Sequence, residues 1–272
     1  MRLANMSPFH QAFPFWAVAF LGLMLLSALL SFLWTPYEIE MVNLAHRLQP
    51  PNQHHWLGTD HFGRDMLSLM MVGVKDSLLI ACFSVGLGAI IAIPLGMICA
   101  YFSGMFSWIV DRSSDLIFAF PALLSAILLT AIYGPNRLNV ILSIAIYTLP
   151  IFFRLARAAS QRVMAEEFVM AAKALGTPAR SIIWRHILPN IMGLLWVQIA
   201  IQCAIAILIE AGISFLGFGQ PSPGLSWGRM LADAQSYLYQ APHTVIIPGV
   251  FIMGCVISFN HIAEYLRHDH TL

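Results

Sequence analysis

Four residues in one polar segment of the sequence could bind a metal ion. His54, His55, Asp60 and His61 lie close together in the chain, and imidazole and carboxylate groups are common ligands of zinc and other transition metals. The two adjacent histidines are followed by a third after five other residues, which matches no metal-binding pattern with a known mechanism. We therefore expect an ordered polar loop without a metal site, and keep metal binding as the alternative.

A second chemical candidate is Glu210, a carboxylate inside the apolar stretch from Ile191 to Phe218. An acidic side chain within a membrane faces the bundle interior or a water-filled path by default. Two interpretations stay open. Glu210 lies on the translocation path of a transporter, or it is a hydrogen-bonded core residue that joins two helices. In the first interpretation, Glu210 could also serve as the proton carrier of an ion-coupled secondary transporter, or as a catalytic group of a membrane-embedded enzyme.

The remaining reactive groups exclude several functions. No nucleophile–base pair and no metal-ligand spacing converges inside the apolar stretches, which argues against an enzyme. No G-x-x-x-x-G-K-[ST] loop occurs, so the chain has no visible means of hydrolysing ATP. The cysteines lie in apolar stretches without paired spacing, and we expect them to be small core residues; they are Cys82, Cys99, Cys203 and Cys255.

The composition places these groups in a membrane. Of the 272 residues, 59% are hydrophobic and 10% are charged, whereas a soluble domain carries about 25% charged residues. The composition predicts an all-α polytopic membrane protein, because helices satisfy their own backbone hydrogen bonds in lipid. The formal net charge of +1 argues against a nucleic-acid partner.

Six apolar segments are long enough to span a bilayer. They are residues 13–34, 78–101, 116–133, a fourth from Leu138 past Pro150, 191–218 and 244–263. The first is expected to be a retained span, since no cleavage site follows it. Prolines within spans need neighbouring helices to satisfy the freed backbone groups, which indicates a packed bundle around an irregular path.

Basic residues predict the orientation. With the N-terminus inside, nine Lys and Arg residues lie in inner segments and five in outer segments, so both termini should be cytoplasmic. Residues 1–12 are then a cytoplasmic N-terminus, 35–77 a periplasmic loop and 78–263 a five-helix core. The core includes a cytoplasmic loop at 160–189, and residues 264–272 form a cytoplasmic tail.

The cytoplasmic loop contains the longest charged segment, residues 166–190. It predicts two short helices separated by a sharp break. Leu175 ends the first helix, and Gly176 follows at the position where a left-handed backbone conformation is favoured. Thr177 is a suitable N-cap and Pro178 a suitable first residue for the second helix. An apolar stripe follows the first helix: Met164, Phe168, Ala171 or Ala172, and Leu175.

This segment resembles the EAA loop of permease subunits of binding-protein-dependent ABC importers. The resemblance rests on Met170-Ala171-Ala172, Gly176 and Ile187-Leu188-Pro189. An outer segment resembles the signature of the second permease of peptide and nickel importers: Leu57-Gly58-Thr59-Asp60-x-x-Gly63-Arg64-Asp65. Further similar motifs are Ala119-Phe120-Pro121, Arg185-His186-Ile187-Leu188-Pro189-Asn190, Ser214-Phe215-Leu216-Gly217 and Ser226-Trp227-Gly228. Together they cover the chain from about Pro50 to the C-terminus.

The resemblance implies a type I ABC importer permease fold in a bacterial inner membrane. It implies a heterodimer with a second permease, two ABC ATPase subunits inside and a periplasmic binding protein outside. ATP would be used by the partner subunits, and this chain would bind no cofactor. The residues that would dock into the ATPase subunit are Ala171, Ala172, Leu175, Gly176, Thr177, Pro178, Leu188 and Pro189. The outer motif that would receive substrate comprises Gly58, Thr59, Asp60, Gly63, Arg64 and Asp65.

Two positions depart from the pattern of this family. Met170 stands where the loop usually opens on glutamate, and Leu69 stands where an arginine commonly follows the outer signature. We therefore expect docking to depend on the shape of Ala171, Ala172 and Gly176 and not on a carboxylate. Peptides and nickel or other metal chelates are both substrates that the resemblance implies, and the histidines of the outer motif are closer to the nickel type. The absence of an internal inverted repeat argues against a secondary transporter.

Overall fold

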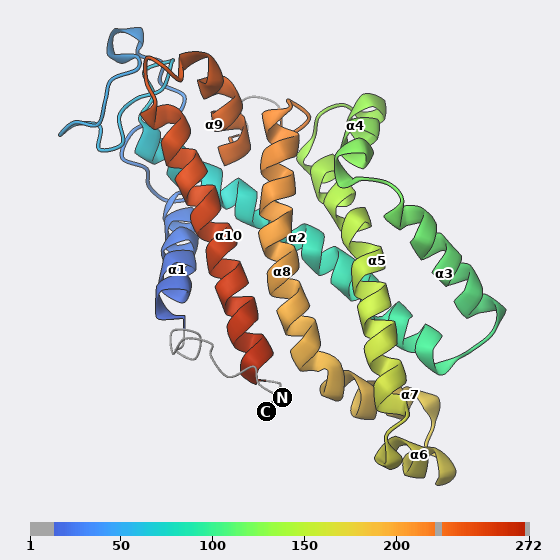
Figure 1. Ribbon diagram of the computed structural model, residues 1–272. Coiled ribbons are helices and arrows are strands. Elements are labelled where there is room, and N and C mark those ends of the chain that lie inside the picture. Colours follow the sequence, from blue (N-terminus) through green and yellow to red (C-terminus); the bar gives the residue numbers. More distant parts are fainter. Residues whose placement is uncertain (1–13, 221–224, 270–272) are drawn as a thin grey trace, which may run out of the picture.

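The computed structural model describes residues 14–220 and 225–269, and this part of the chain is helical without β-strands (Figure 1). The helices are α1 (Phe15–Leu30), α2 (Met66–Tyr101), α3 (Met105–Phe118), α4 (Ala122–Tyr133), α5 (Arg137–Met164), α6 (Glu167–Ala174), α7 (Ala179–Ser181), α8 (Leu188–Phe215), α9 (Trp227–Ala234) and α10 (His243–Asp269). A π-helical segment, Ile182–Ile187, joins α7 to α8, and short 3₁₀ turns lie at Leu44–His46 and Gln235–Tyr237.

Four helical segments of the described chain are long and apolar enough to cross a membrane: Met66–Tyr101, Arg137–Met164, Ala179–Phe215 and His243–His268. A fifth is reached if α3 and α4, which meet at an angle of 85°, form one broken span. The first predicted span contains α1, whose 16 helical residues are fewer than the roughly 20 that a transmembrane helix needs.

The second span begins earlier than predicted. The sequence places its start at Leu78, after the charged residues Lys75 and Asp76, but α2 begins at Met66. Tertiary contacts explain the difference, because Arg137 of α5 pairs with Asp76 at 2.7 Å and the Lys75 ammonium lies 4.6 Å from the centre of the Phe32 ring. These contacts let two charged residues lie within one helix, and the polar loop predicted for residues 35–77 ends before them.

The third span also differs from its prediction. Asp111 and Arg112, which were expected in a short loop, lie within α3. The chain then bends sharply at Pro121, which precedes the first residue of α4 with an extended backbone. Proline disfavours the helical conformation of the residue before it, so residues 116–133 form parts of two helices and not one interrupted helix.

The second helix predicted in residues 166–190 is much longer than expected. It begins at Ala179, and Pro178 takes the N-cap position that was predicted for Thr177. From there the helix continues through Ile182–Ile187 into α8. Pro189 near the start of α8 lacks an N–H and would clash with the carbonyl four residues earlier in a regular α-helix. The wider π-helical turn just before it relieves this clash.

The last two predicted segments need smaller corrections. The fifth span was expected to reach Phe218, but α8 ends at Phe215. The loop predicted for residues 220–243 contains α9 and a 3₁₀ turn. The half-buried polar residues Arg229 and Asp233 alternate in α9 with the buried Trp227 and Met230, so the sequence of this short helix does not resemble an apolar span.

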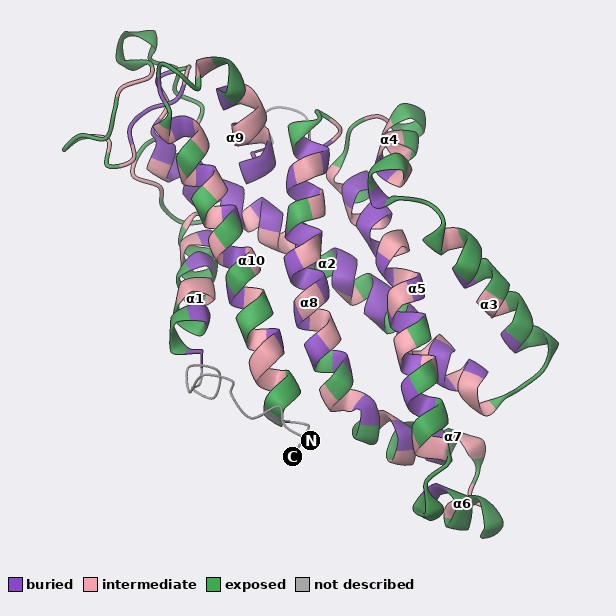
Figure 2. Cartoon of the chain, in the orientation of Figure 1, coloured by how far each residue is buried: buried purple, intermediate pink, exposed green. Residues whose placement is uncertain are grey.

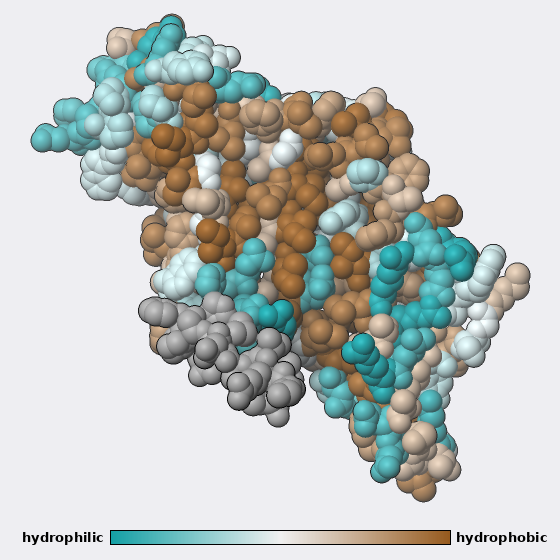
Figure 3. All heavy atoms as spheres, viewed as in Figure 1, coloured by the Kyte–Doolittle hydropathy of each residue, from teal (hydrophilic) through white to brown (hydrophobic). Residues whose placement is uncertain are grey.

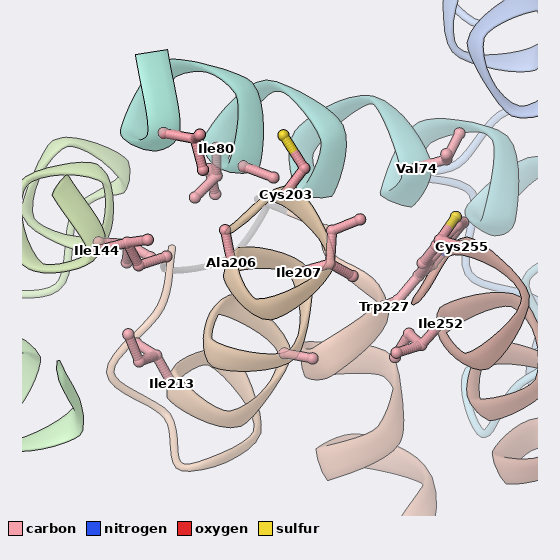
Figure 4. Close-up of a cluster of buried hydrophobic side chains, with 14 of the residues drawn as sticks. Val74, Ile80, Ile144, Cys203, Ala206, Ile207, Ile213, Trp227, Ile252 and Cys255 are labelled. Atoms are coloured by element: carbon pink, nitrogen blue, oxygen red, sulfur yellow. The ribbon is translucent and has the colours of Figure 1, made fainter. Parts of the chain in front are cut away.

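The main core lies between α2, α5, α8, α9 and α10, with Ile144, Ile207, Trp227 and Ile252 among its buried side chains (Figure 4). A second cluster surrounds Met97 and Val169 at the other end of α2. Cys99, Cys203 and Cys255 are buried as predicted, whereas Cys82 is exposed on α2 beside the exposed Phe83.

The surface along the sides of the helical bundle is largely apolar. Exposed residues are frequent on α3 and α4 (Figure 2), and many of them are large hydrophobic side chains such as Leu116, Leu124 and Leu128. Figure 3 shows apolar residues across the middle of one face, with hydrophilic residues gathered mainly at two opposite ends. This distribution suits a protein whose sides contact lipid or another membrane subunit.

Candidate functional site

The predicted outer motif folds into a closed turn immediately before α2. Asp60 is buried, and its Oδ1 accepts hydrogen bonds from the backbone N–H groups of Phe62 (2.9 Å) and Arg64 (2.8 Å). Its Oδ2 pairs with the Arg64 guanidinium at 2.6 Å. Arg64 is therefore held in an ion pair with Asp60 inside the turn. Gly58 and Gly63 both adopt positive φ, 77° and 74°, as the turn requires.

Thr59 connects this turn to the preceding loop. Its hydroxyl donates to the His46 carbonyl at 2.5 Å and accepts from the Gln49 N–H at 2.8 Å. Its own carbonyl lies 3.3 Å from Nε2 of His243 at the start of α10. Because Thr59 is fully buried, these contacts hold the outer motif against both the loop and the helical bundle.

Asp65 ends the motif and begins α2. Its Oδ2 accepts hydrogen bonds from both the backbone N–H and the hydroxyl of Ser68 at 2.9 Å, which is the usual N-cap arrangement. Its Oδ1 lies 3.0 Å from Nδ1 of His55. The last residue of the motif thus fixes the start of the longest helix relative to the outer loop.

Replacing Asp65 with alanine is expected to destabilise the outer end of α2 by about 2 kcal/mol, because the cap is lost and the buried Ser68 groups lose their acceptor. Asp65→Asn is the matched control, since its amide oxygen can still cap the helix. Hydrogen exchange of the α2 amides in the purified protein measures the difference. Equal protection of Met66 to Met70 in the alanine variant and the wild type would contradict this role.

The histidines of the outer segment do not converge on a metal site. His55 contacts Asp65, whereas the His61 ring stacks on Tyr237 with centroids 5.4 Å apart. Burial lowers the pKa of His61, against the opposing effect of Asp60 and Asp233, so its ring is neutral at pH 7. Within residues 14–220 and 225–269, no group of three His, Cys, Asp or Glu side chains could hold a metal ion.

Residues between Tyr37 and Asp65 line a large hollow of about 760 Å³ that is open to solvent. Its walls carry many groups that can form hydrogen bonds, and they include Tyr37, Glu38, Asn43, His46, Gln49 and Asn52. Arg64 and Asp65 of the motif also line it. The motif therefore lies in the wall of a hollow that offers hydrogen-bonding groups to a partner molecule.

Glu210 lies in the core with no exposed surface. Its carboxylate accepts hydrogen bonds from the hydroxyls of Ser77 on α2 (3.0 Å) and Ser214 on α8 (2.7 Å). In this conformation Glu210 joins two helices, which is one of the two interpretations left open by the sequence. Its partner Ser77 was missed, although the adjacent Asp76 in an apolar helix is a sign that buried polar contacts occur there.

The segment that was predicted to dock lies on α6 and the turn that follows it. Gly176 has a φ of 76°, so the predicted left-handed position is confirmed. Its N–H donates to the Lys173 carbonyl, and the Thr177 N–H donates to the Ala172 carbonyl, both at 3.0 Å. This pair of hydrogen bonds is a Schellman motif, and it sets the direction in which the chain leaves α6.

The apolar stripe of α6 is accessible. Leu175 is 86% exposed and Met170 52% exposed, and Ala171 and Pro178 are exposed with them. Other residues of the predicted docking set lie differently: Ala172 and Thr177 are half-buried, Pro189 is exposed, and Leu188 packs against the second core cluster. The exposed part of the predicted set is therefore the end of α6 with its turn, and Pro189 of α8.

Comparison with known proteins agrees with this architecture. Residues 92–269 match the family described as binding-protein-dependent transport system inner membrane component. The dipeptide transport system permease protein DppC of Alkalihalophilus pseudofirmus is 38% identical over 96% of this chain and 88% of its own length. The glutathione transport system permease protein GsiD of Pectobacterium atrosepticum is 36% identical over 85% of this chain and 77% of its own length. A putative peptide permease protein of Brucella suis is 37% identical over 92% and 85%, respectively.

A solved structure shares the fold. A chain of the inward-facing MetNI methionine ABC transporter superposes with a TM-score of 0.64, at 16% identity, over 76% of this chain and 98% of that chain. At this identity the likeness shows the type I permease fold alone. The family match covers more than half of the sequence, and the DppC relative covers nearly all of it. The chain therefore belongs to the family of inner membrane components of binding-protein-dependent transport systems, and it is a permease subunit of an ABC importer and not an enzyme.

Proposed function

We propose that this permease forms, with a second permease subunit, the path through which peptides cross a bacterial inner membrane. A periplasmic binding protein delivers the peptide, and two separate ABC ATPase subunits supply the energy. The observation that carries the substrate class is the 38% identity to a dipeptide permease across 96% of the chain. Relatives named for glutathione and peptide transport support the same class.

The two predicted contact regions lie at opposite ends of the bundle. The outer motif precedes α2 beside α9, whereas α6 and the final turns of α10 lie toward the other end (Figure 1). Together with the excess of basic residues in the inner segments, this arrangement supports a cytoplasmic α6 and cytoplasmic termini. The outer motif, from Gly58 to Asp65, would then face the periplasm and receive substrate from the binding protein.

The proposed mechanism is alternating access. When ATP binding closes the ATPase pair, α6 moves with the subunit on which its exposed face docks. The helical run from Ala179 to Phe215 starts directly after the Gly176 turn and continues through the membrane, so a movement of the docking segment reaches the permease core without a flexible joint. This is a two-state transition biased by a ligand bound on another chain. ATP is used by the partner subunits, and this chain needs no cofactor of its own.

Uptake by the reconstituted complex tests the function. The complete transporter and its binding protein are placed in proteoliposomes, and uptake of dipeptides, glutathione and nickel chelates is measured with and without internal ATP. We expect ATP-dependent peptide uptake. Uptake of nickel chelates in place of peptides would favour the nickel type, and uptake by this subunit alone without ATP would identify a secondary transporter.

Two substitutions of Glu210 test its role. If Glu210 is a hydrogen-bonded link between two helices, the Glu210→Gln variant should keep near wild-type uptake. Its amide can still form hydrogen bonds with both Ser77 and Ser214. Glu210→Ala should destabilise the protein by about 2–4 kcal/mol, since two buried hydroxyls lose their partner. The prediction that Glu210 lies on the translocation path requires the opposite pattern, in which the glutamine variant loses uptake while its thermal stability is unchanged.

A further inference from the structure

The docking helix α6 also has an inner face. Val169 has no exposed surface and belongs to the second core cluster, with Met97 of α2 and Ile183 of the π-helical segment. Lys173 follows four residues later, one turn along the same face. Its ammonium lies 5.1 Å from the centre of the Tyr101 ring, within the range of a cation–π interaction. The exposed stripe that contains Leu175 is not used in either contact.

Both partners on α2 lie in its last turns. Tyr101 is the final residue of the helix, and Met97 lies one turn before it. The two pairs therefore have the same spacing: residues 97 and 101 of α2 and residues 169 and 173 of α6. A shared apolar cluster and a cation–π contact thus place the inner face of α6 near the end of α2.

At its other end, α2 begins in the outer motif. Asp65 caps the helix and also contacts His55 of the outer loop. The 36 residues of α2 span roughly 54 Å at 1.5 Å per residue. One continuous helix therefore runs from the proposed site of substrate delivery to the inner face of the docking helix, crossing behind α8 and α5 (Figure 1).

We propose that Tyr101 and Lys173 are positioning residues that link α2 to α6, so that events at the outer motif alter ATP hydrolysis through α2. This inference rests on the proposed function and adds a second route to the one through α8. The Lys173–Tyr101 contact is separate from the contacts that lead to α8, because α6 approaches the π-helical segment through the Val169 cluster and through Phe168, whose ring lies 6.3 Å from that of His186. Loss of Tyr101 would remove the route through α2 and leave the route through α8 in place.

The test measures stimulation of ATP hydrolysis by the peptide-loaded binding protein in the complete reconstituted transporter. In Tyr101→Leu and Lys173→Met, which keep apolar bulk, we expect stimulation to fall roughly two- to fivefold, the change that an exposed cation–π contact can account for. The double variant should show no further fall. Tyr101→Phe and Lys173→Arg should keep stimulation, and Phe106→Leu, which removes an exposed aromatic ring of α3, is the matched control.

Several outcomes would overturn the inference. One is unchanged stimulation in both Tyr101→Leu and Lys173→Met, and another is an equal loss in Phe106→Leu. The amount of ATPase subunit that copurifies with each variant separates lost positioning from lost assembly. If the Tyr101→Leu complex fails to assemble, the Lys173→Met and Lys173→Arg variants still test the inference, because Lys173 is exposed. A wild-type complex that shows neither stimulation nor uptake would instead contradict the proposed function itself.

Discussion

Replacing Gly176 with valine is expected to uncouple ATP hydrolysis from transport. Gly176 has a φ of 76°, where a β-branched residue costs about 1–3 kcal/mol. A Cβ atom at this position would meet no other atom within 4 Å, so the cost arises from the backbone alone. To relieve it, the Schellman turn after α6 must open, and the angle between the docking helix and α7 would change.

Gly176→Asn is the matched control, because asparagine tolerates the left-handed conformation while adding a side chain. In proteoliposomes, the valine variant should hydrolyse ATP with little peptide uptake, whereas the asparagine variant should keep the wild-type ratio of uptake to hydrolysis. If Gly176→Val transports at the wild-type ratio, the turn does not set the coupling geometry.

The Gly176 turn shows what sequence alone can predict. Its conformation follows from residues next to one another, and the prediction of a left-handed glycine after Leu175 is confirmed. The cap of the following helix was wrong by one residue, because Pro178 and not Thr177 precedes the first helical residue. The sequence also failed to predict that the second helix continues into α8. Pro189 suggests that the helix ends there, and only a π-helical turn before the proline lets it continue.

Contacts between distant residues limit the prediction of the site. Asp60 and Arg64, which form an ion pair, are only four residues apart. The Glu210–Ser77 and Asp76–Arg137 contacts join residues that are 133 and 61 positions apart. No local pattern reveals such partners. The start of α2 was misplaced for the same reason, because Asp76 pairs with Arg137 of α5 and Lys75 lies on the Phe32 ring.

The close packing of α2 against α5 leads to the last prediction. Gly96 is buried, and a Cβ atom there would lie 2.6 Å from the Phe153 carbonyl oxygen and 3.0 Å from the Arg157 backbone nitrogen. Backbone atoms cannot move aside as a flexible side chain can, so the two helices would have to separate. We expect Gly96→Ala to destabilise the permease by about 1–3 kcal/mol, the usual cost of overpacking.

Gly86 of the same helix is the control, since a Cβ atom there would meet nothing within 4 Å. Alanine favours a helix over glycine by roughly 1 kcal/mol, so Gly86→Ala should leave stability unchanged or raise it. Thermal unfolding of the purified subunit and its yield in membranes measure both variants. Tyr101 is also part of α2. If Gly96→Ala separates α2 from α5, the complex with this variant should therefore lose stimulation of ATP hydrolysis by the binding protein as well as stability. Equal stability of the two alanine variants would show that α2 and α5 do not approach as closely as Gly96 indicates.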